Sequence, residues 1–259
     1  MAKLFIGTSG WIYKDWDGIF YPKDLSSKNK LKYFARHFKT TEINYSFYYL
    51  PRPKTYQNWY FQTPKDFIFS VKASRFITHI KRLKGVSQAW RIFLKNTLSL
   101  KEKLGPILFQ FPPSFQATQE NIKRLKKFLS ILRGRTSIKL SSISRGSASK
   151  NLRYAFEFRH PSWCNEKIYS LLKKFNVAWV IADSPNYPKS EVITADFVYL
   201  RMHGSQVLFG SKYTKKELRD LAQKIKKWLS LKKDVFIYFN NDFAGYAVQN
   251  AQELLKLAK

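Results

Sequence analysis

Short runs of β-branched and aromatic residues recur along the whole chain, and most are separated by stretches whose apolar residues repeat at helical spacing. Eight runs are rich in Val, Ile, Phe and Tyr, which is typical of buried strands. In order they are residues 3–9, 40–46, 66–74, 105–112, 154–160, 178–184, 196–204 and 234–242. A strand followed by a helix, repeated along a chain, indicates a parallel sheet covered by helices. The pattern therefore predicts one α/β domain over residues 1–259, a TIM-type (β/α)8 barrel.

Three stretches between the strands carry more specific signals. Thr214 and Glu217 have the spacing of a capping box, so a helix is expected to begin directly after Thr214. Residues 184–195 are short and contain two prolines, so the helix between the sixth and seventh strands is expected to be missing or very short. Residues 133–153 are basic and serine-rich without an acidic residue, which predicts a flexible insertion on the amino-terminal face of the barrel. That insertion is either a tolerated loop or an arm for nucleic acid or a protein partner.

Polar residues near the carboxyl ends of the strands interrupt the apolar pattern. Strand side chains alternate between the barrel interior and the helices, so polar residues on the inward-facing set need partners or a ligand. By this alternation the inward set is Glu42, Asn44, Ser46, Ser70, Lys72, Ser74, Gln110, Glu157, Arg159, Asp183, Arg201, His203, Tyr238, Asn240 and Asp242. Barrel enzymes keep their active sites at this end, which favours a site there. A self-neutralising network of ion pairs is the alternative.

The residue types in this set favour acid/base chemistry on an anionic or sugar-like molecule. The expected catalytic residues are Glu157, His203, Asp183 and Lys72. The expected substrate-binding residues are Glu42, Asn44, Gln110, Arg159, His160, Arg201, Asn240, Asp242 and Trp11. Arginine can clamp a phosphate or carboxylate through two parallel hydrogen bonds, and histidine titrates near neutral pH. Lys72 is a candidate nucleophile, although an ion pair with Glu42 is the preferred expectation, and His160 could equally cap a helix.

Two further features of the site stay open. Glu157, Asp183, His203 and Asp242 could together hold a divalent metal, although their spacing does not require one. Aromatic residues that follow strand ends could stack on a base or a sugar, or could belong to the core. They are Trp11, Tyr13, Trp16, Phe47, Tyr48, Phe111 and Trp163.

The composition adds a second hypothesis about function. The formal net charge is +30, from 47 basic and 17 acidic residues, which attracts polyanions if it is clustered and is only a solvated surface if it is diffuse. No stretch has the roughly 18 apolar residues of a membrane helix, and the start shows no signal-peptide pattern. The single cysteine, Cys164, cannot form an internal disulfide, so we expect a cytoplasmic protein.

Eight segments of the sequence resemble the YecE-like proteins, domain-of-unknown-function family 72. They include GTSGW at residues 7–11, FSVKAS at 69–74, FEFRHPSW at 156–163 and LRMHG at 200–204, and together they span nearly the full chain. The resemblance implies a TIM-type barrel but no settled activity. It carries over the polar positions Gly7, Thr8, Ser9, Gly10, Trp11, Glu42, Asn44, Lys72, Ser74, Gln110, Glu157, Arg159, His160, Asp183, Arg201, His203, Asn240, Asn241 and Asp242. The insertion and the strong positive charge depart from the family pattern.

The sequence therefore leaves two main function classes, besides a non-catalytic barrel that serves as a scaffold. The favoured one is an enzyme that acts on a small anionic or sugar-like substrate at the carboxyl-terminal face, with its reaction class open. The alternative is a nucleic-acid-binding protein or nuclease that uses the basic surface and the aromatic rim.

Overall fold

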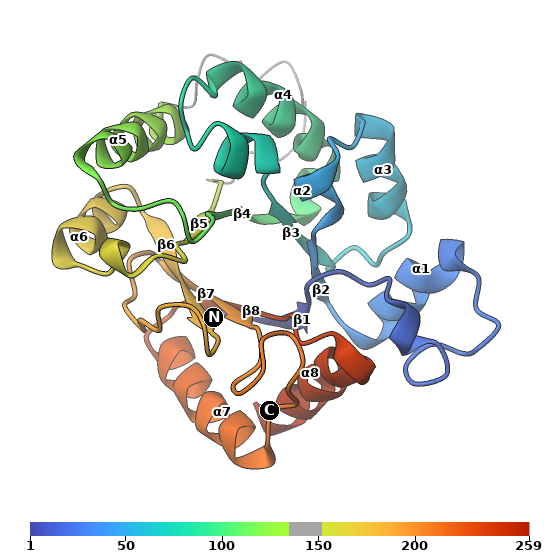
Figure 1. The fold of residues 1–259 in the computed structure, drawn as a ribbon. Coiled ribbons are helices and arrows are strands. Elements are labelled where there is room, and N and C mark those ends of the chain that lie inside the picture. The colour runs from blue at the N-terminus through green and yellow to red at the C-terminus, as the bar shows by residue number, and fades with distance from the viewer. Residues whose placement is uncertain (135–151, 259) are drawn as a thin grey trace.

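The computed structural model describes residues 1–134 and 152–258, and in it eight parallel strands form one sheet (Figure 1). The strands are β1 (Leu4–Thr8), β2 (Thr40–Ile43), β3 (Ile68–Lys72), β4 (Leu104–Gln110), β5 (Tyr154–Glu157), β6 (Val177–Asp183), β7 (Phe197–Met202) and β8 (Asp234–Phe239). Their order, β1-β8-β7-β6-β5-β4-β3-β2, confirms the predicted barrel. The expectation of a flexible insertion at 133–153 concerns residues that lie mostly outside the described ranges.

Helices surround the sheet and cross back between successive strands (Figure 1). They are α1 (Ser27–His37), α2 (Tyr45–Tyr48), α3 (Pro53–Phe61), α4 (Ser87–Thr97), α5 (Gln119–Arg133), α6 (Glu166–Lys174), α7 (Lys215–Ser230) and α8 (Tyr246–Leu257). Short turns of other helix types are η1 (Lys14–Trp16), η2 (Phe76–Ile80), η3 (Leu98–Lys103), η5 (Pro161–Trp163) and η6 (Phe243–Gly245). Within the described residues β6 runs to β7 without a helix, and Thr214 caps α7 in a capping box, so both predictions are confirmed.

The barrel closes between β1 and β2, at a seam made by few backbone contacts. β1 pairs with β8 over five residues, whereas β2 meets it through a parallel bridge between Ser9 and Glu42. Gly7 permits this approach, because a Cβ at that position would lie 2.1 Å from the carbonyl oxygen of Thr40. The side chain of Thr41 adds a hydrogen bond to the backbone oxygen of Thr8 at 3.0 Å. The seam is therefore held by side chains as much as by backbone.

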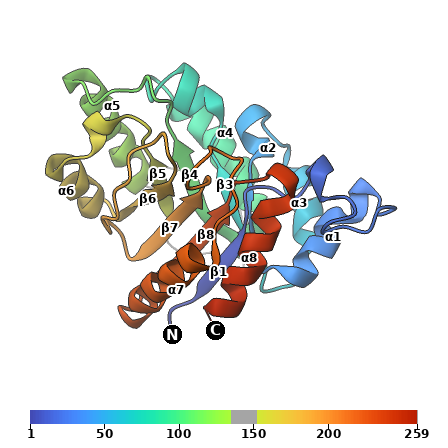
Figure 2. The ribbon, with the colours of Figure 1, turned by 60° about the horizontal axis from the view of Figure 1, so that its bottom comes forward.

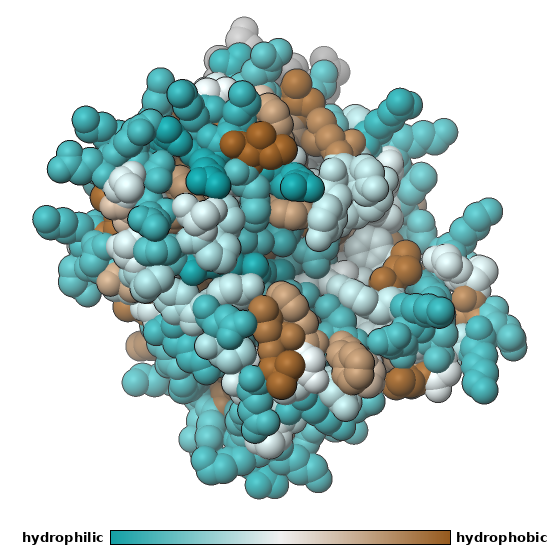
Figure 3. Space-filling model, viewed as in Figure 1, coloured by the Kyte–Doolittle hydropathy of each residue, from teal (hydrophilic) through white to brown (hydrophobic). Residues whose placement is uncertain are grey.

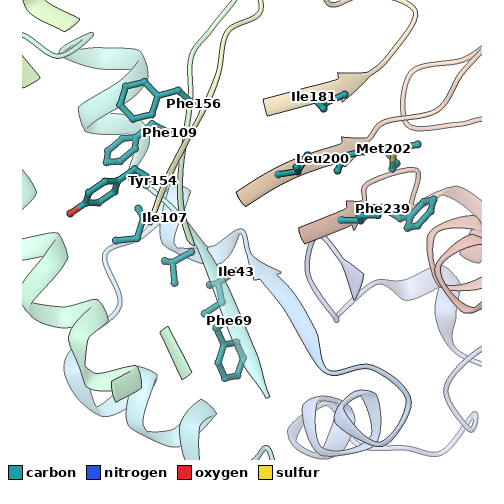
Figure 4. Close-up of a cluster of buried hydrophobic side chains, with 14 of the residues drawn as sticks. Ile43, Phe69, Ile107, Phe109, Tyr154, Phe156, Ile181, Leu200, Met202 and Phe239 are labelled. Carbon is teal, nitrogen blue, oxygen red and sulfur yellow. The ribbon is translucent and has the colours of Figure 1, made fainter. Parts of the chain in front are cut away.

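The strands separate two apolar layers. Residues on the outward faces pack against the helices, as Figure 4 shows for Ile43, Phe109, Leu200 and Phe239. The inward faces fill the floor of the barrel with Leu108, Ala155, Ala178, Val180, Phe197, Tyr199, Phe236 and Tyr238. The hydroxyl group of Tyr199 pairs with Ser70 at 2.6 Å, and that of Tyr238 pairs with Thr40 at 2.8 Å. The floor of the barrel is thus filled, and the hydroxyl groups within it are paired.

The loops that follow the strands gather at one end of the barrel, and both chain termini lie at the other (Figure 2). Viewed from the loop end, the surface is mainly hydrophilic with separate hydrophobic groups (Figure 3). Exposed apolar side chains on these loops include Ile12, Tyr48, Phe76, Phe209 and Phe243. None of the helices among the described residues has the length and apolar content needed to cross a membrane.

Candidate active site

Arg201, near the end of β7, is buried in the barrel mouth and holds two carboxylates. Its Nη2 and Nε donate to the Oε1 and Oε2 atoms of Glu42 at 2.7 and 3.1 Å, and its Nη1 donates to Glu157 Oε2 at 2.7 Å. Burial alone would lower the pKa of the guanidinium, but the two carboxylates raise it above its ordinary value. Arg201 therefore stays charged and ties the ends of β2 and β5 to β7.

The two carboxylates also accept hydrogen bonds from other side chains. Glu157 Oε1 accepts from Arg159 Nε at 2.8 Å, while Glu42 accepts from Ser9 Oγ at 2.8 Å and from the hydroxyl of Tyr199 at 2.7 Å. Burial would raise the pKa of Glu157, but the two guanidinium groups hold it well below its usual range. These two carboxylates and two guanidiniums neutralise one another, so this part of the inward set forms an ion-pair network, whereas Lys72 lies outside it.

Lys72, at the end of β3, stands apart from this network. Its side chain is buried, yet within the described residues it forms no ion pair or hydrogen bond with a carboxylate, so the expected ion pair with Glu42 is wrong. The reason is that Arg201 binds Glu42 through two nitrogens. The Lys72 ammonium lies 4.1 Å from the centre of the Phe47 ring. Burial, and then the charge of Arg201, lowers the Lys72 pKa to about 7.

His203 follows β7 and is fully buried. Its Nδ1 lies 3.1 Å from the Nδ2 atom of Asn240, which can only donate, so the ring hydrogen of neutral His203 belongs on Nε2. That Nε2 lies 3.5 Å from Glu157 Oε1 and has no closer hydrogen-bond partner within the described residues. Burial lowers the His203 pKa to about 4 despite the neighbouring carboxylate. The ring is therefore a neutral hydrogen-bond donor at neutral pH.

The side of the mouth formed by the ends of β3, β4 and β5 carries mainly positive or donor groups. Arg159 packs on the Tyr187 ring at 4.1 Å and donates to its hydroxyl at 3.0 Å. His79, on the η2 turn, lies 3.5 Å from the Nε2 atom of Gln110. Burial, followed by the charges of Lys72 and Arg159, lowers the His79 pKa to about 4. This clustering of positive charge favours an anion.

Polar groups at the β1–β2 seam complete the mouth. The Asn44 Nδ2 atom donates to the backbone oxygen of Ser9 at 3.1 Å, and its buried Oδ1 atom has no hydrogen-bond partner among the described residues. Asp242 follows β8 and lines a pocket with Tyr13 and Phe209, and its buried Oδ1 atom likewise has no hydrogen-bond partner in the described part of the chain. Burial raises the Asp242 pKa to about 7. The seam therefore offers unpaired acceptor atoms, opposite in character to the cationic side.

Asp183 was predicted to point into the barrel, and this is wrong. In β6 the inward residues are Ala178 and Val180, so the last residue of the strand faces outward. Asp183 pairs with Lys189 at 2.7 Å and lines a separate cavity of about 240 Å³ with Trp228. That cavity lies beside α7, where the helix between β6 and β7 is missing.

Trp11 lies in the core rather than in the mouth, and His160 takes the capping role that was the alternative to substrate binding. Trp11 is buried in the core, edge-on to Trp59 with ring centres 5.4 Å apart. His160 caps the η5 turn, where its Nδ1 atom accepts from the backbone amide of Ser162 at 3.2 Å. Of the other proposed rim aromatics, Trp16, Phe111 and Trp163 are fully buried. Most of these aromatic residues therefore belong to the core, which was one of the two alternatives, although Tyr48 is exposed.

The proposed metal ligands do not come together in the described part of the chain. No group of three or more His, Cys, Asp or Glu side chains there is arranged to hold a metal ion. The outward position of Asp183 removes one member, and Glu157 is already paired with two arginines. The side chains present at the mouth therefore do not fit the metal alternative.

The sequence and the fold can now be compared with known proteins. The family model described as "Protein of unknown function DUF72" matches residues 5–259. The chain belongs to the DUF72 family. Its membership confirms the resemblance read from the motifs, and it establishes the fold without naming a reaction.

Relatives of this DUF72 chain match it over most of its length. The UPF0759 protein YunF of Bacillus subtilis is 28% identical, covering 98% of this chain and 94% of that protein. The UPF0759 protein YecE of Escherichia coli K12 is 26% identical over 62% of this chain and 50% of its own length. The crystal structure of a DUF72 family protein of Thermotoga maritima, TM1631, superposes with a TM-score of 0.82, at 27% identity and 98% coverage of both chains.

Proposed function

We propose that this DUF72 chain is an enzyme that binds a small anionic substrate in the barrel mouth and uses Lys72 in acid/base chemistry. The observation that carries the proposal is the position of Lys72. It is only 9% exposed at a strand end, and no carboxylate is paired with it among the residues that the structure describes. Burying an unpaired ammonium costs several kcal/mol, so its place in the fold calls for a ligand.

The charges around Lys72 favour an anionic ligand. Glu42 and Glu157 are paired with Arg201 and Arg159, so neither carboxylate forms an ion pair with Lys72. The Arg159 side chain is still 13% exposed, and its Nη2 atom has no hydrogen-bond partner within the described residues. An ammonium and a free guanidinium nitrogen together can bind one phosphate or carboxylate group.

The protonation state of Lys72 suits proton transfer. A pKa of about 7 means that both the amine and the ammonium are populated at neutral pH. A catalytic group works best as an acid or base when its pKa lies near the working pH. His203 Nε2 supplies a neutral donor on the β7 side of the mouth, and Glu157 keeps its charge.

A ligand screen by thermal unfolding tests this proposal. The panel holds inorganic phosphate, small carboxylates, sugar phosphates and short oligonucleotides at fixed ionic strength, with wild type, Lys72→Met and Lys39→Met. Lys39 pairs with Asp66 on the surface, so its variant is the matched control for losing one positive charge. We expect a small anion to raise the Tm of wild type and control but not of Lys72→Met.

Two results would contradict the proposal. One is that no small anion stabilises the wild type. The other is stabilisation that persists in full in Lys72→Met. Stabilisation by oligonucleotides alone, equal in all three proteins, would assign binding to the basic surface instead.

A further inference from the structure

The described residues contain three buried lysines, and only one lacks a polar partner. Lys30 pairs with Asp17 at 2.6 Å. Lys103 donates to the backbone oxygens of Tyr60 and Thr63 at 2.6 and 2.8 Å and to the Thr63 hydroxyl at 3.0 Å. Lys72 has neither a carboxylate nor a carbonyl acceptor among these residues. Lys30 and Lys103 therefore have structural roles, whereas the amine of Lys72 has no structural partner among these residues.

The surroundings of Lys72 hold its amine in a fixed place. The residue ends β3, whose backbone is paired on both sides by β2 and β4. Its carbonyl oxygen accepts from the Ser46 hydroxyl at 2.6 Å, which ties it to α2. The Phe47 ring of the same helix covers the amine at 4.1 Å. A reactive group on a strand, fixed by its neighbours, is better positioned than one on a loop.

We propose that the Lys72 amine forms an imine with the carbonyl carbon of a small anionic aldehyde or ketone, such as a keto acid or a sugar phosphate. This inference rests on the proposed function, because it needs an anionic substrate in the mouth. Arg159 would hold the anionic group while the carbonyl lies over Lys72. A buried lysine beside cationic groups is the setting in which lysine acts as a nucleophile.

The step balances without an oxidant or another co-reactant. The neutral amine adds to the carbonyl carbon, so a C–N bond forms and the carbonyl oxygen takes up a proton. The resulting carbinolamine then loses its hydroxyl group as water, which breaks the C–O bond and leaves C=N. The two hydrogens of the amine leave with that oxygen. Imine nitrogen alternates between neutral and cationic forms, and both kinds of charge act on Lys72, since Arg201 lowers its pKa while Glu42 and Glu157 raise it.

Borohydride trapping tests the inference. The folded protein is incubated at pH 7 with pyruvate, dihydroxyacetone phosphate or glyceraldehyde 3-phosphate, reduced with borohydride, digested and mapped by mass spectrometry. We expect Lys72 to be labelled at least about tenfold faster than exposed lysines such as Lys39, because an ordinary lysine is almost fully protonated at this pH. Labelling should slow when inorganic phosphate competes.

Two variants separate the imine from the binding site. Lys72→Arg keeps the positive charge and should abolish the fast label while circular dichroism and the Tm show a folded protein. Lys39→Met should leave the fast label unchanged. The imine inference is overturned if labelling is spread evenly over the lysines or persists at the same rate in Lys72→Arg. If labelling fails while Lys72→Met still loses stabilisation by small anions, the imine falls and the proposed function stands.

Discussion

The floor of the barrel and its mouth are both lined by inward-facing strand residues, yet they differ in how completely their buried polar atoms are hydrogen-bonded. In the floor, the tyrosine hydroxyls of β7 and β8 are paired with Ser70 and Thr40. In the mouth, Asn44 Oδ1, His203 Nε2 and Asp242 Oδ1 are buried without a hydrogen-bond partner among the described residues. Native proteins satisfy nearly all buried polar atoms, so these three exceptions support the proposed binding site, although others, such as Trp16 Nε1 and Trp179 Nε1, lie in the core.

The largest effect on stability is expected from the ion-pair network around Arg201, the part of the mouth whose charged groups are all paired. Glu42→Ala leaves the buried Arg201 with one carboxylate and should lower the free energy of unfolding by about 3–5 kcal/mol. Urea unfolding measures this, with Asp66→Ala as the control, since its surface ion pair with Lys39 should contribute only about 0–1 kcal/mol. A loss equal to that of the control would mean that the network contributes nothing to the fold.

Lys72→Met should raise the free energy of unfolding, in contrast to Glu42→Ala, and the size of this gain should depend on pH. The Lys72 pKa is about 7 in the folded protein and about 10.4 in an unfolded chain, so the unfolded state binds more protons between these values. Wild-type stability therefore carries a penalty that is complete below pH 7 and disappears as pH rises toward 10. The variant should be more stable than wild type by about 2–4 kcal/mol at pH 6–7, with the difference shrinking by pH 10. Urea unfolding at each pH gives both values, and a difference independent of pH would refute the penalty.

The smallest effect on stability is expected for Lys103→Met, which tests whether the paired Lys103 and the unpaired Lys72 differ in their contribution to stability. The substitution leaves the backbone oxygens of Tyr60 and Thr63 without their donor, which should cost about 1–3 kcal/mol. At pH 7 the two lysine variants should therefore shift stability in opposite directions. Differential scanning calorimetry of both proteins in one buffer checks the signs, and a gain in Lys103→Met would show that the two burials are equivalent.

The alternation of apolar and polar residues predicted the strands and most of the inward side chains. The residues that it misplaced have identifiable physical reasons. Glu42, Glu157 and Arg201 were found because each interrupts an apolar strand on the inward face. Asp183 was misplaced because β6 reads VAWVIAD, which is apolar on both faces and gives the alternation no reference point. Trp11 and His160 lie beyond their strands, where alternation no longer applies.

The pairing within the mouth could not be predicted from residue types. Arg201 and Lys72 are both cations on the inward face, and only the position of the longer, forked side chain decides that Glu42 belongs to Arg201. Tyr199 shares the face of Arg201 in β7, so its bond to Glu42 had a signal in the alternation that was overlooked. Tyr187 lies on the irregular segment after β6 and had none.

The seam between β1 and β2 links the assembly of the mouth to the completion of the fold. Ser9 and Glu42 form the backbone bridge of the seam and also belong to the charge network around Arg201. During synthesis Glu42 and Glu157 leave the ribosome long before the seventh strand supplies their common counter-ion. A chain stopped short of that strand would hold two carboxylates with no guanidinium to bridge them. A complete charge network in the mouth therefore requires a closed barrel, and a chain truncated before the seventh strand would lack it.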